Sequence, residues 1–198
     1  AWLRTRRFWV QILAGAPNLF MEKNLEIKGL LAILFIGFIL RLFAIYFYSD
    51  EALTNEWAVI LKNFKVTGTF GLNVVQSEFF AFPYVAQEGE EVLPTIFMPP
   101  LYYYFIYTVD IIFDNFSNIV NYIVILQTLF SLISIILFYK IIKNFEKDRL
   151  IIFLTTSIFA FFPLNAYACS QISSITIQVF LLLSFVLALI KYINSRKL

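Results

Sequence analysis

The stretch YFYSDEALTNEWAVILKNF, residues 46–64, contains the point at which a hydrophobic helix ends and an amphipathic one begins. Two adjacent acids, Asp50 and Glu51, directly follow an almost unbroken apolar run. From Leu53 onward, apolar residues recur at helical spacing, and Gly68 supplies a stop signal. We therefore expect a helix that lies on a membrane surface, with Asp50 as its N-cap.

The composition is that of an integral membrane protein. Hydrophobic residues make up 61% of the chain and charged residues only 14%, whereas soluble domains carry about 25% charged residues. The chain has no histidine and one cysteine, Cys169, which excludes internal disulfides, zinc–histidine sites and histidine-based triads. Any metal would have to be a hard ion with oxygen ligands, such as Mg²⁺ or Mn²⁺, and too few such ligands are evident to assign a site.

Four runs are long enough to cross a membrane, which takes about 20 mainly apolar residues. A fifth run, residues 100–113, is shorter and contains Asp110, so a full crossing there would bury a charge. We expect this run to form a re-entrant or interfacial helix. The four predicted spans are residues 29–48, 119–139, 150–168 and 172–190.

Loop charges predict the topology, because cytoplasmic segments carry an excess of Lys and Arg. Residues 1–28, 140–149 and 191–198 are basic, whereas the loop at residues 49–99 is acidic. With four spans, all the basic segments lie on the cytoplasmic side and the acidic loop lies outside. The expected fold is therefore all-α, with about four transmembrane helices, an outer-surface amphipathic helix and a short re-entrant or interfacial helix. We expect it in the bacterial inner (plasma) membrane, with a cytoplasmic N-terminus and no nucleic-acid partner.

The first methionine, Met21, is followed by a short basic stretch of the kind with which many membrane proteins begin. Residues 1–20 are therefore either upstream translated sequence or a basic amphipathic surface helix. We expect residues 29–198 to form one transmembrane module.

Three stretches form an ordered series of motifs: LRLFAIYFYSDEALTNEWAVILKNFKVTGTFGLN, FMPPLYYYFIYTV and FPLNAYACSQISSITIQVFLLLSF. In order and spacing they resemble the N-terminal third of the GT-C glycosyltransferases, closest to the protein O-mannosyltransferase and lipid A aminoarabinose transferase type. The shared features are an Arg-Leu late in the first span, an acidic pair at its outer end, an amphipathic helix and a proline-rich entry into an aromatic helix. The resemblance covers roughly residues 30–190 and implies that the chain is a fragment of a larger GT-C fold, inactive by itself.

The resemblance implies transfer of a sugar from a polyprenyl-phosphate-linked donor to an acceptor hydroxyl of a protein, lipid or glycan, on the extracytoplasmic face. By position, Asp50 inherits the role of general base, and Glu51 would orient the acceptor or tune Asp50. Family members commonly carry a second acid in the next outer loop, where this chain has Ser174 with Gln171 nearby. No metal site is assigned. The substrate-binding candidates are Lys62, Lys65, Pro100, Tyr102 and Tyr103.

Structural explanations stand beside these functional ones. Lys62 and Lys65 are also typical of interfacial lysines, and the prolines and tyrosines before residue 105 are typical of a helix start and an aromatic belt. For Arg41 we expect a structural pairing with a neighbouring helix. The alternative functions are a transporter or lipid-handling protein, and a non-catalytic membrane scaffold in which Asp50 only caps a helix.

Overall fold

The computed structural model describes residues 2–53, 55–76, 81–86, 90–94, 99–114 and 116–196; the side chains of 2–23, 55, 74–76, 81–84 and 117 lie outside the description. The fold is predominantly helical, as predicted, with one pair of short strands that the sequence did not predict. In chain order the elements are α1 (Trp2–Tyr48), α2 (Asn55–Thr67), β1 (Asn73–Gln76), β2 (Ala81–Tyr84), α3 (Pro100–Phe113), the 3-10 turn η1 (Phe116–Asn118), α4 (Ile119–Phe145), α5 (Arg149–Phe161), α6 (Pro163–Ser170) and α7 (Ile175–Ser195).

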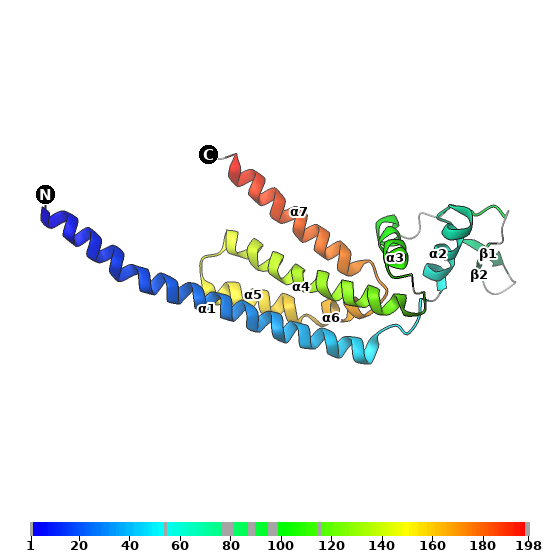
Figure 1. Cartoon of the computed structure of the whole chain (residues 1–198), viewed down its shortest axis with the longest axis horizontal. Coiled ribbons are helices and arrows are strands. Elements are labelled where there is room, and N and C mark those ends of the chain that lie inside the picture. The colour runs from blue at the N-terminus through cyan, green and yellow to red at the C-terminus, as the bar shows by residue number, and fades with distance from the viewer. Residues whose placement is uncertain are drawn as a thin grey trace.

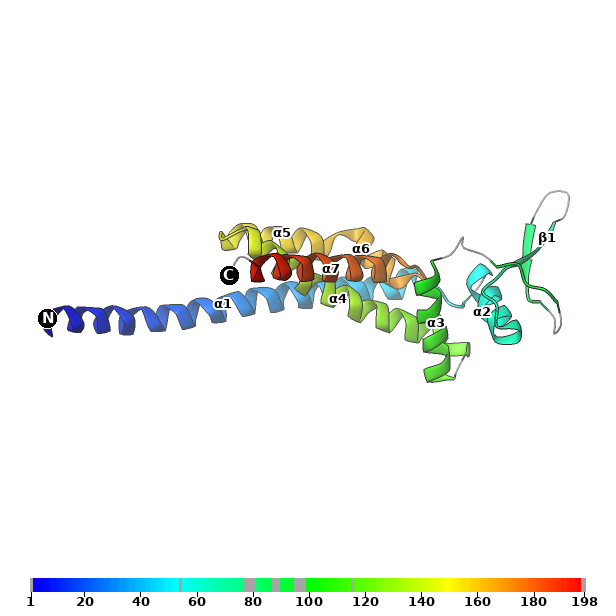
Figure 2. The ribbon, with the colours of Figure 1, turned by 90° about the horizontal axis from the view of Figure 1, so that it is seen from above.

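The long helices form a bundle whose axis is horizontal in Figures 1 and 2. Within the described residues, three helical segments are long and apolar enough to cross a membrane: Asn24–Tyr48, Ile119–Phe145 and Ile175–Ser195. The bent pair α5–α6 would be a fourth, with an angle of 41° between its parts. Three of the four predicted spans are therefore confirmed as continuous helices. The fourth predicted span, 150–168, corresponds to the bent pair, whose helix breaks between Phe161 and Pro163.

Charged segments lie at opposite ends of the bundle. The α4–α5 turn and the C-terminal end of α7 lie toward the end where the N-terminus is found, while α2, α3 and the strands lie at the other end (Figure 1). At the basic end, the Glu26 carboxylate of α1 accepts hydrogen bonds from Tyr139 and Lys143 of α4. This separation of basic and acidic segments is the one that the four-span topology requires.

The predicted short helix has the predicted bounds, Pro100–Phe113. It runs across the end of the bundle, since it does not follow the bundle axis in either view (Figures 1 and 2). Its charged residue, Asp110, is buried and forms an ion pair with Lys65 of α2. The cost of burying this carboxylate is thereby offset by an opposite charge.

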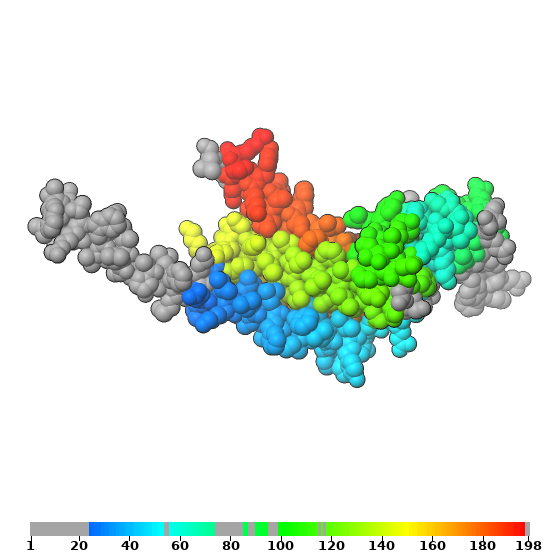
Figure 3. All heavy atoms as spheres, in the orientation of Figure 1, coloured from blue at the N-terminus to red at the C-terminus, as the bar shows by residue number. Residues whose placement is uncertain are grey.

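Helix α2 packs on α3, and Figure 3 shows the two side by side at one end of the molecule. The apolar stripe that the sequence predicted includes Ile60 and Leu61, which are almost fully buried in a core shared with Tyr102 and Tyr103. The helix ends at Thr67, and Gly68 follows with φ +71, a left-handed conformation that glycine adopts without strain. The amphipathic helix is therefore confirmed, but its apolar face contacts protein.

The segment after α2 is folded around two asparagines. Strands β1 and β2 pair antiparallel, with Asn73 opposite Tyr84. Asn63, which is fully buried, donates to the Gly71 carbonyl at 3.1 Å and accepts from the Ala86 N–H at 2.8 Å. Asn73 in turn accepts from the Leu93 N–H at 3.1 Å. Asn63 thereby fastens this segment to α2, and Asn73 joins the two sides of the segment. The described parts of the acidic loop therefore have a defined structure.

Pro163 causes the break between α5 and α6, because it has no N–H to donate to the carbonyl of Phe159 four residues earlier. The side-chain amide of Asn165 replaces that donor at 3.1 Å. The next carbonyl, that of Ala160, accepts from Arg41 Nη1 at 3.2 Å. Two side chains thus satisfy carbonyls that the break leaves without helical partners.

Arg41 is fully buried where α1, α4 and α5 meet. Its Nε donates to Ser131 Oγ at 2.8 Å, and Nη1 also donates to the Gly37 carbonyl at 2.8 Å. The structural pairing predicted for Arg41 is confirmed. Its partners are a hydroxyl and carbonyls at a broken helix end, where the helix dipole favours a positive charge.

A double-mutant cycle tests the role of Asn165 at the break. Asn165→Ala removes the donor to the Phe159 carbonyl and should lower the free energy of unfolding by about 1–3 kcal/mol. In a Pro163→Ala background the new backbone N–H can take over, so the same change should cost less than half as much. Unfolding of the purified protein in mixed micelles measures both values.

The matched control is Asn144→Ala, because Asn144 is exposed on α4 and should change stability by no more than about 0.5 kcal/mol. An equal cost of Asn165→Ala in both backgrounds would contradict the assignment of Asn165 as the replacement donor.

Candidate active site at the exit of the first span

Asp50 lies directly beyond α1, which ends at Tyr48, and its carboxylate turns toward the connection between α6 and α7. Oδ2 accepts a hydrogen bond from the Ile172 N–H at 2.8 Å. Helix α2 begins only at Asn55, so the prediction that Asp50 is its N-cap is wrong. Residues 51–54 separate Asp50 from the first turn of α2. The N–H that its carboxylate meets belongs to Ile172, which is distant in the chain.

The connection that holds Asp50, residues 171–174, is itself held by Gln127 in the interior of α4. Gln127 Nε2 donates to the Gln171 carbonyl at 2.8 Å, and the Gln171 side chain donates to the Tyr48 carbonyl at the end of α1. Gln127 Oε1 accepts from the Tyr102 hydroxyl at 2.8 Å. A chain of hydrogen bonds therefore connects α1, α3, α4 and the α6–α7 connection around Asp50.

Within this network, the pKa of the Tyr102 hydroxyl is strongly raised. Burial raises the pKa of its hydroxyl far above the usual value, the negative charge of Asp50 raises the pKa further, and a hydrogen bond from the Ser173 backbone opposes them. The hydroxyl therefore stays protonated as a donor at all ordinary pH values. The same interactions show that Asp50, Tyr102 and Ser173 lie close enough to influence one another.

The two acids of the pair have different surroundings. Asp50 is half-buried and hydrogen-bonded, whereas Glu51 is exposed. A carboxylate held by one backbone N–H at the edge of a folded surface can still accept a proton from a bound hydroxyl. Glu51 is free to meet a molecule that approaches from solvent.

The other predicted site residues lie in two places. Pro100 is exposed in the first turn of α3, and Tyr103, next to Tyr102, donates to the Trp57 carbonyl at 2.9 Å. Lys65 is paired with Asp110, and Lys62 lies 5.2 Å from the centre of the Phe116 ring. Tyr102 and Asp110 are eight residues apart on α3, about 12 Å along the helix. The structure therefore brings Tyr102 to Asp50 and keeps the two lysines near the other end of α3.

Sequence reasoning did not assign Gln127, Gln171 or Ser173 to the site. Gln127 carries a usable signal, because a polar side chain within an apolar span needs an internal partner. Among the residues that the structure describes, no group of three or more acidic or cysteine side chains could hold a metal ion.

Comparison with known proteins adds nothing to this geometry: no protein-family model, no curated protein and no solved structure matches the chain.

Removing the Tyr102 hydroxyl tests the network. Tyr102→Phe leaves the buried Gln127 Oε1 without its donor, so we expect the free energy of unfolding to fall by about 1–3 kcal/mol. Tyr104→Phe is the matched control, because Tyr104 is 52% exposed, and it should change stability by less than about 0.5 kcal/mol. Denaturant unfolding of both variants in micelles gives the comparison, and equal effects would sink the assignment.

Proposed function

We propose that the chain is the N-terminal membrane module of a GT-C type, mannosyltransferase-like glycosyltransferase that uses a polyprenyl-phosphate sugar as donor. One observation carries the proposal. The carboxylate of Asp50 lies at the end of the first span, where α1, α3 and the α6–α7 connection converge on it. The resemblance of the ordered motifs to GT-C enzymes supports the same assignment for Asp50.

The proposed reaction uses Asp50 as general base. Its carboxylate takes the proton from the acceptor hydroxyl while the acceptor oxygen forms a bond to the anomeric carbon of the sugar. The bond between that carbon and the phosphate oxygen breaks, and polyprenyl phosphate leaves with the bonding electron pair. Tyr102 is a positioning residue, because its hydroxyl already donates to Gln127. Glu51, exposed beside the base, would orient the acceptor.

The place of the site suits a donor of this kind. A polyprenyl phosphate keeps its chain in the bilayer and its phosphate at the interface, which is the level at which α1 ends. On this proposal the basic end of the bundle is cytoplasmic and the loop at residues 49–99 is extracytoplasmic, in the bacterial inner membrane. Lys62, which is exposed, would help to attract the phosphate. Lys65 is less suited, since Asp110 already neutralises it.

The connection 171–174 supports the proposal by its position. It corresponds to the place where GT-C relatives commonly carry a second acid, and in this chain the same place contacts Asp50 through the Ile172 N–H at 2.8 Å. The residues there are neutral. Asp50 would therefore work with a backbone N–H and neutral neighbours where relatives have a second carboxylate.

Replacement of Asp50 by asparagine tests the proposal. The change keeps the size of the side chain and removes its basicity, so sugar transfer should fall by about 10²–10⁴-fold. Release of the sugar from a panel of polyprenyl-phosphate sugars is measured in membranes that contain the longest reading frame carrying this chain, at matched expression.

Asp114→Asn is the matched control. Asp114 is exposed at the C-cap of α3 with φ 42, a conformation that asparagine also tolerates, so activity should not change. Equal turnover of Asp50→Asn and the unaltered protein would reduce Asp50 to an anchor of the α6–α7 connection and would favour the scaffold interpretation.

A further inference from the structure

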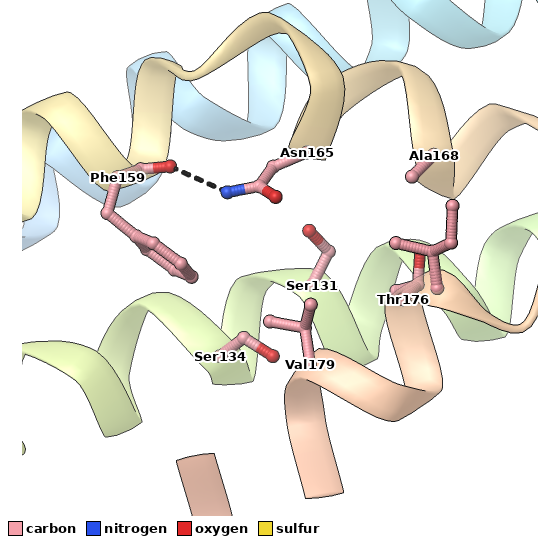
Figure 4. Close-up of a pocket in the computed structure, with 8 residues that line it drawn as sticks. Ser131, Ser134, Phe159, Asn165, Ala168, Thr176 and Val179 are labelled. Atoms are coloured by element: carbon pink, nitrogen blue, oxygen red, sulfur yellow. Dashed lines mark hydrogen bonds between the residues drawn. The ribbon is translucent and has the colours of Figure 1, made fainter. Parts of the chain in front are cut away.

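A small cavity lies inside the bundle, apart from the Asp50 site. It has a volume of about 10 Å³ and is bounded by α4, the α5–α6 break and the start of α7. Its polar lining consists of Ser131, Ser134, Asn165 and Thr176. Figure 4 shows the side chains of Ser131 and Asn165 facing each other, with Thr176 on the neighbouring helix.

Three of the four polar groups that line this cavity have a donor to spare, whereas Ser134 gives its O–H to the Phe130 carbonyl at 2.8 Å. Thr176 is 5% exposed, and its hydroxyl has no hydrogen-bond partner among the described residues. Ser131 Oγ accepts from Arg41 Nε at 2.8 Å, which leaves its own O–H free to donate. Asn165 gives one amide N–H to the Phe159 carbonyl at 3.1 Å and retains a second.

Arg41 adds a positive charge next to the cavity. Its Nε and Nη2 groups present parallel N–H bonds along one edge of the guanidinium, the edge that normally binds an anion. Ser131, which lines the cavity, occupies the Nε position, while Nη2 is buried and has no partner in the described part of the chain. The predicted spans at 29–48, 119–139, 150–168 and 172–190 contain no Asp or Glu that could balance this charge.

We propose that this cavity is a binding site for a single-atom anion of about the size of chloride. A buried cation on one side of the cavity and an unpartnered hydroxyl on the other favour an anion over a neutral or positive ligand. A volume of about 10 Å³ admits one particle of roughly the size of a water molecule, which excludes phosphate and organic acids. The site does not depend on the glycosyltransferase proposal.

The bound anion would connect the two halves of the fourth span to α4 and α7. Arg41 is seven residues before the end of α1 at Tyr48, so its Cα lies about 10 Å along the helix from that end. The anion would balance the charge of Arg41 and would accept a hydrogen bond from the Thr176 hydroxyl. The stability of the bundle should therefore depend on which anion the solution contains.

The test compares thermal unfolding of the purified chain in micelles with sodium chloride and with sodium gluconate, at equal ionic strength. Chloride should raise the Tm in a saturable way, whereas the larger gluconate should not. In Thr176→Val the half-saturating chloride concentration should rise about tenfold or more, because a hydrogen bond to a charged group is lost. In gluconate the variant should be as stable as the unaltered protein or more so, since an unpaired buried hydroxyl is removed.

Thr155→Val is the matched control on α5, because Thr155 does not line the cavity, and it should retain the full chloride effect. Equal Tm values in the two salts, or an undiminished chloride effect in Thr176→Val, would overturn the proposal. If Thr176→Val does not fold, crystals of the unaltered protein grown in bromide decide the question. An anomalous peak in the cavity beside Thr176 Oγ1 and Ser131 Oγ supports the site, and peaks on the surface alone reject it.

Discussion

The break between α5 and α6 is the constraint on which the rest of the structure depends. Pro163 removes one helical hydrogen bond, and Asn165 and Arg41 supply donors to the carbonyls that are left over. The helix bends there by 41°, and α6 packs against α1, with Tyr167 beside Tyr48 at the end of α1. The residues that follow α6 then reach the end of α1 and meet Asp50. A backbone defect inside the bundle therefore positions the candidate active site at its end.

The second organising feature is a polar network within an apolar fold. Gln127 uses both ends of its amide, one toward Tyr102 and the other toward the Gln171 carbonyl. Such a network has a unique geometry, because every buried polar group that loses its partner costs about 1–3 kcal/mol. The network can therefore hold Asp50 in one place at the end of the bundle. Rigid placement of a base is what general acid–base chemistry requires.

Local signals in the sequence predicted the elements, and long-range contacts decided the site. The length and composition of 100–113 predicted α3 correctly, and the spacing after Leu53 together with Gly68 predicted α2 and its end. The cap assigned to Asp50 and the break at Pro163 were missed. Pro163 is itself a local signal for the break, whereas the N–H that Asp50 meets, that of Ile172, and the Arg41 group that bonds the Ala160 carbonyl lie more than one hundred residues away in the chain. No local pattern identifies such a distant partner, although a polar residue within a span indicates that it has an internal partner.

The central claim is that the end of the bundle where α1 terminates receives a lipid-linked phosphate donor. The most direct measurement places a photo-crosslinking amino acid at the exposed position Glu51, or at the half-buried position Glu146 at the opposite end, and adds a radiolabelled polyprenyl-phosphate mannose to the membranes. The account predicts labelling of the Glu51 variant, reduced by excess unlabelled lipid, and none above background for the Glu146 variant. Equal labelling at both positions, or labelling at Glu146 alone, would contradict it.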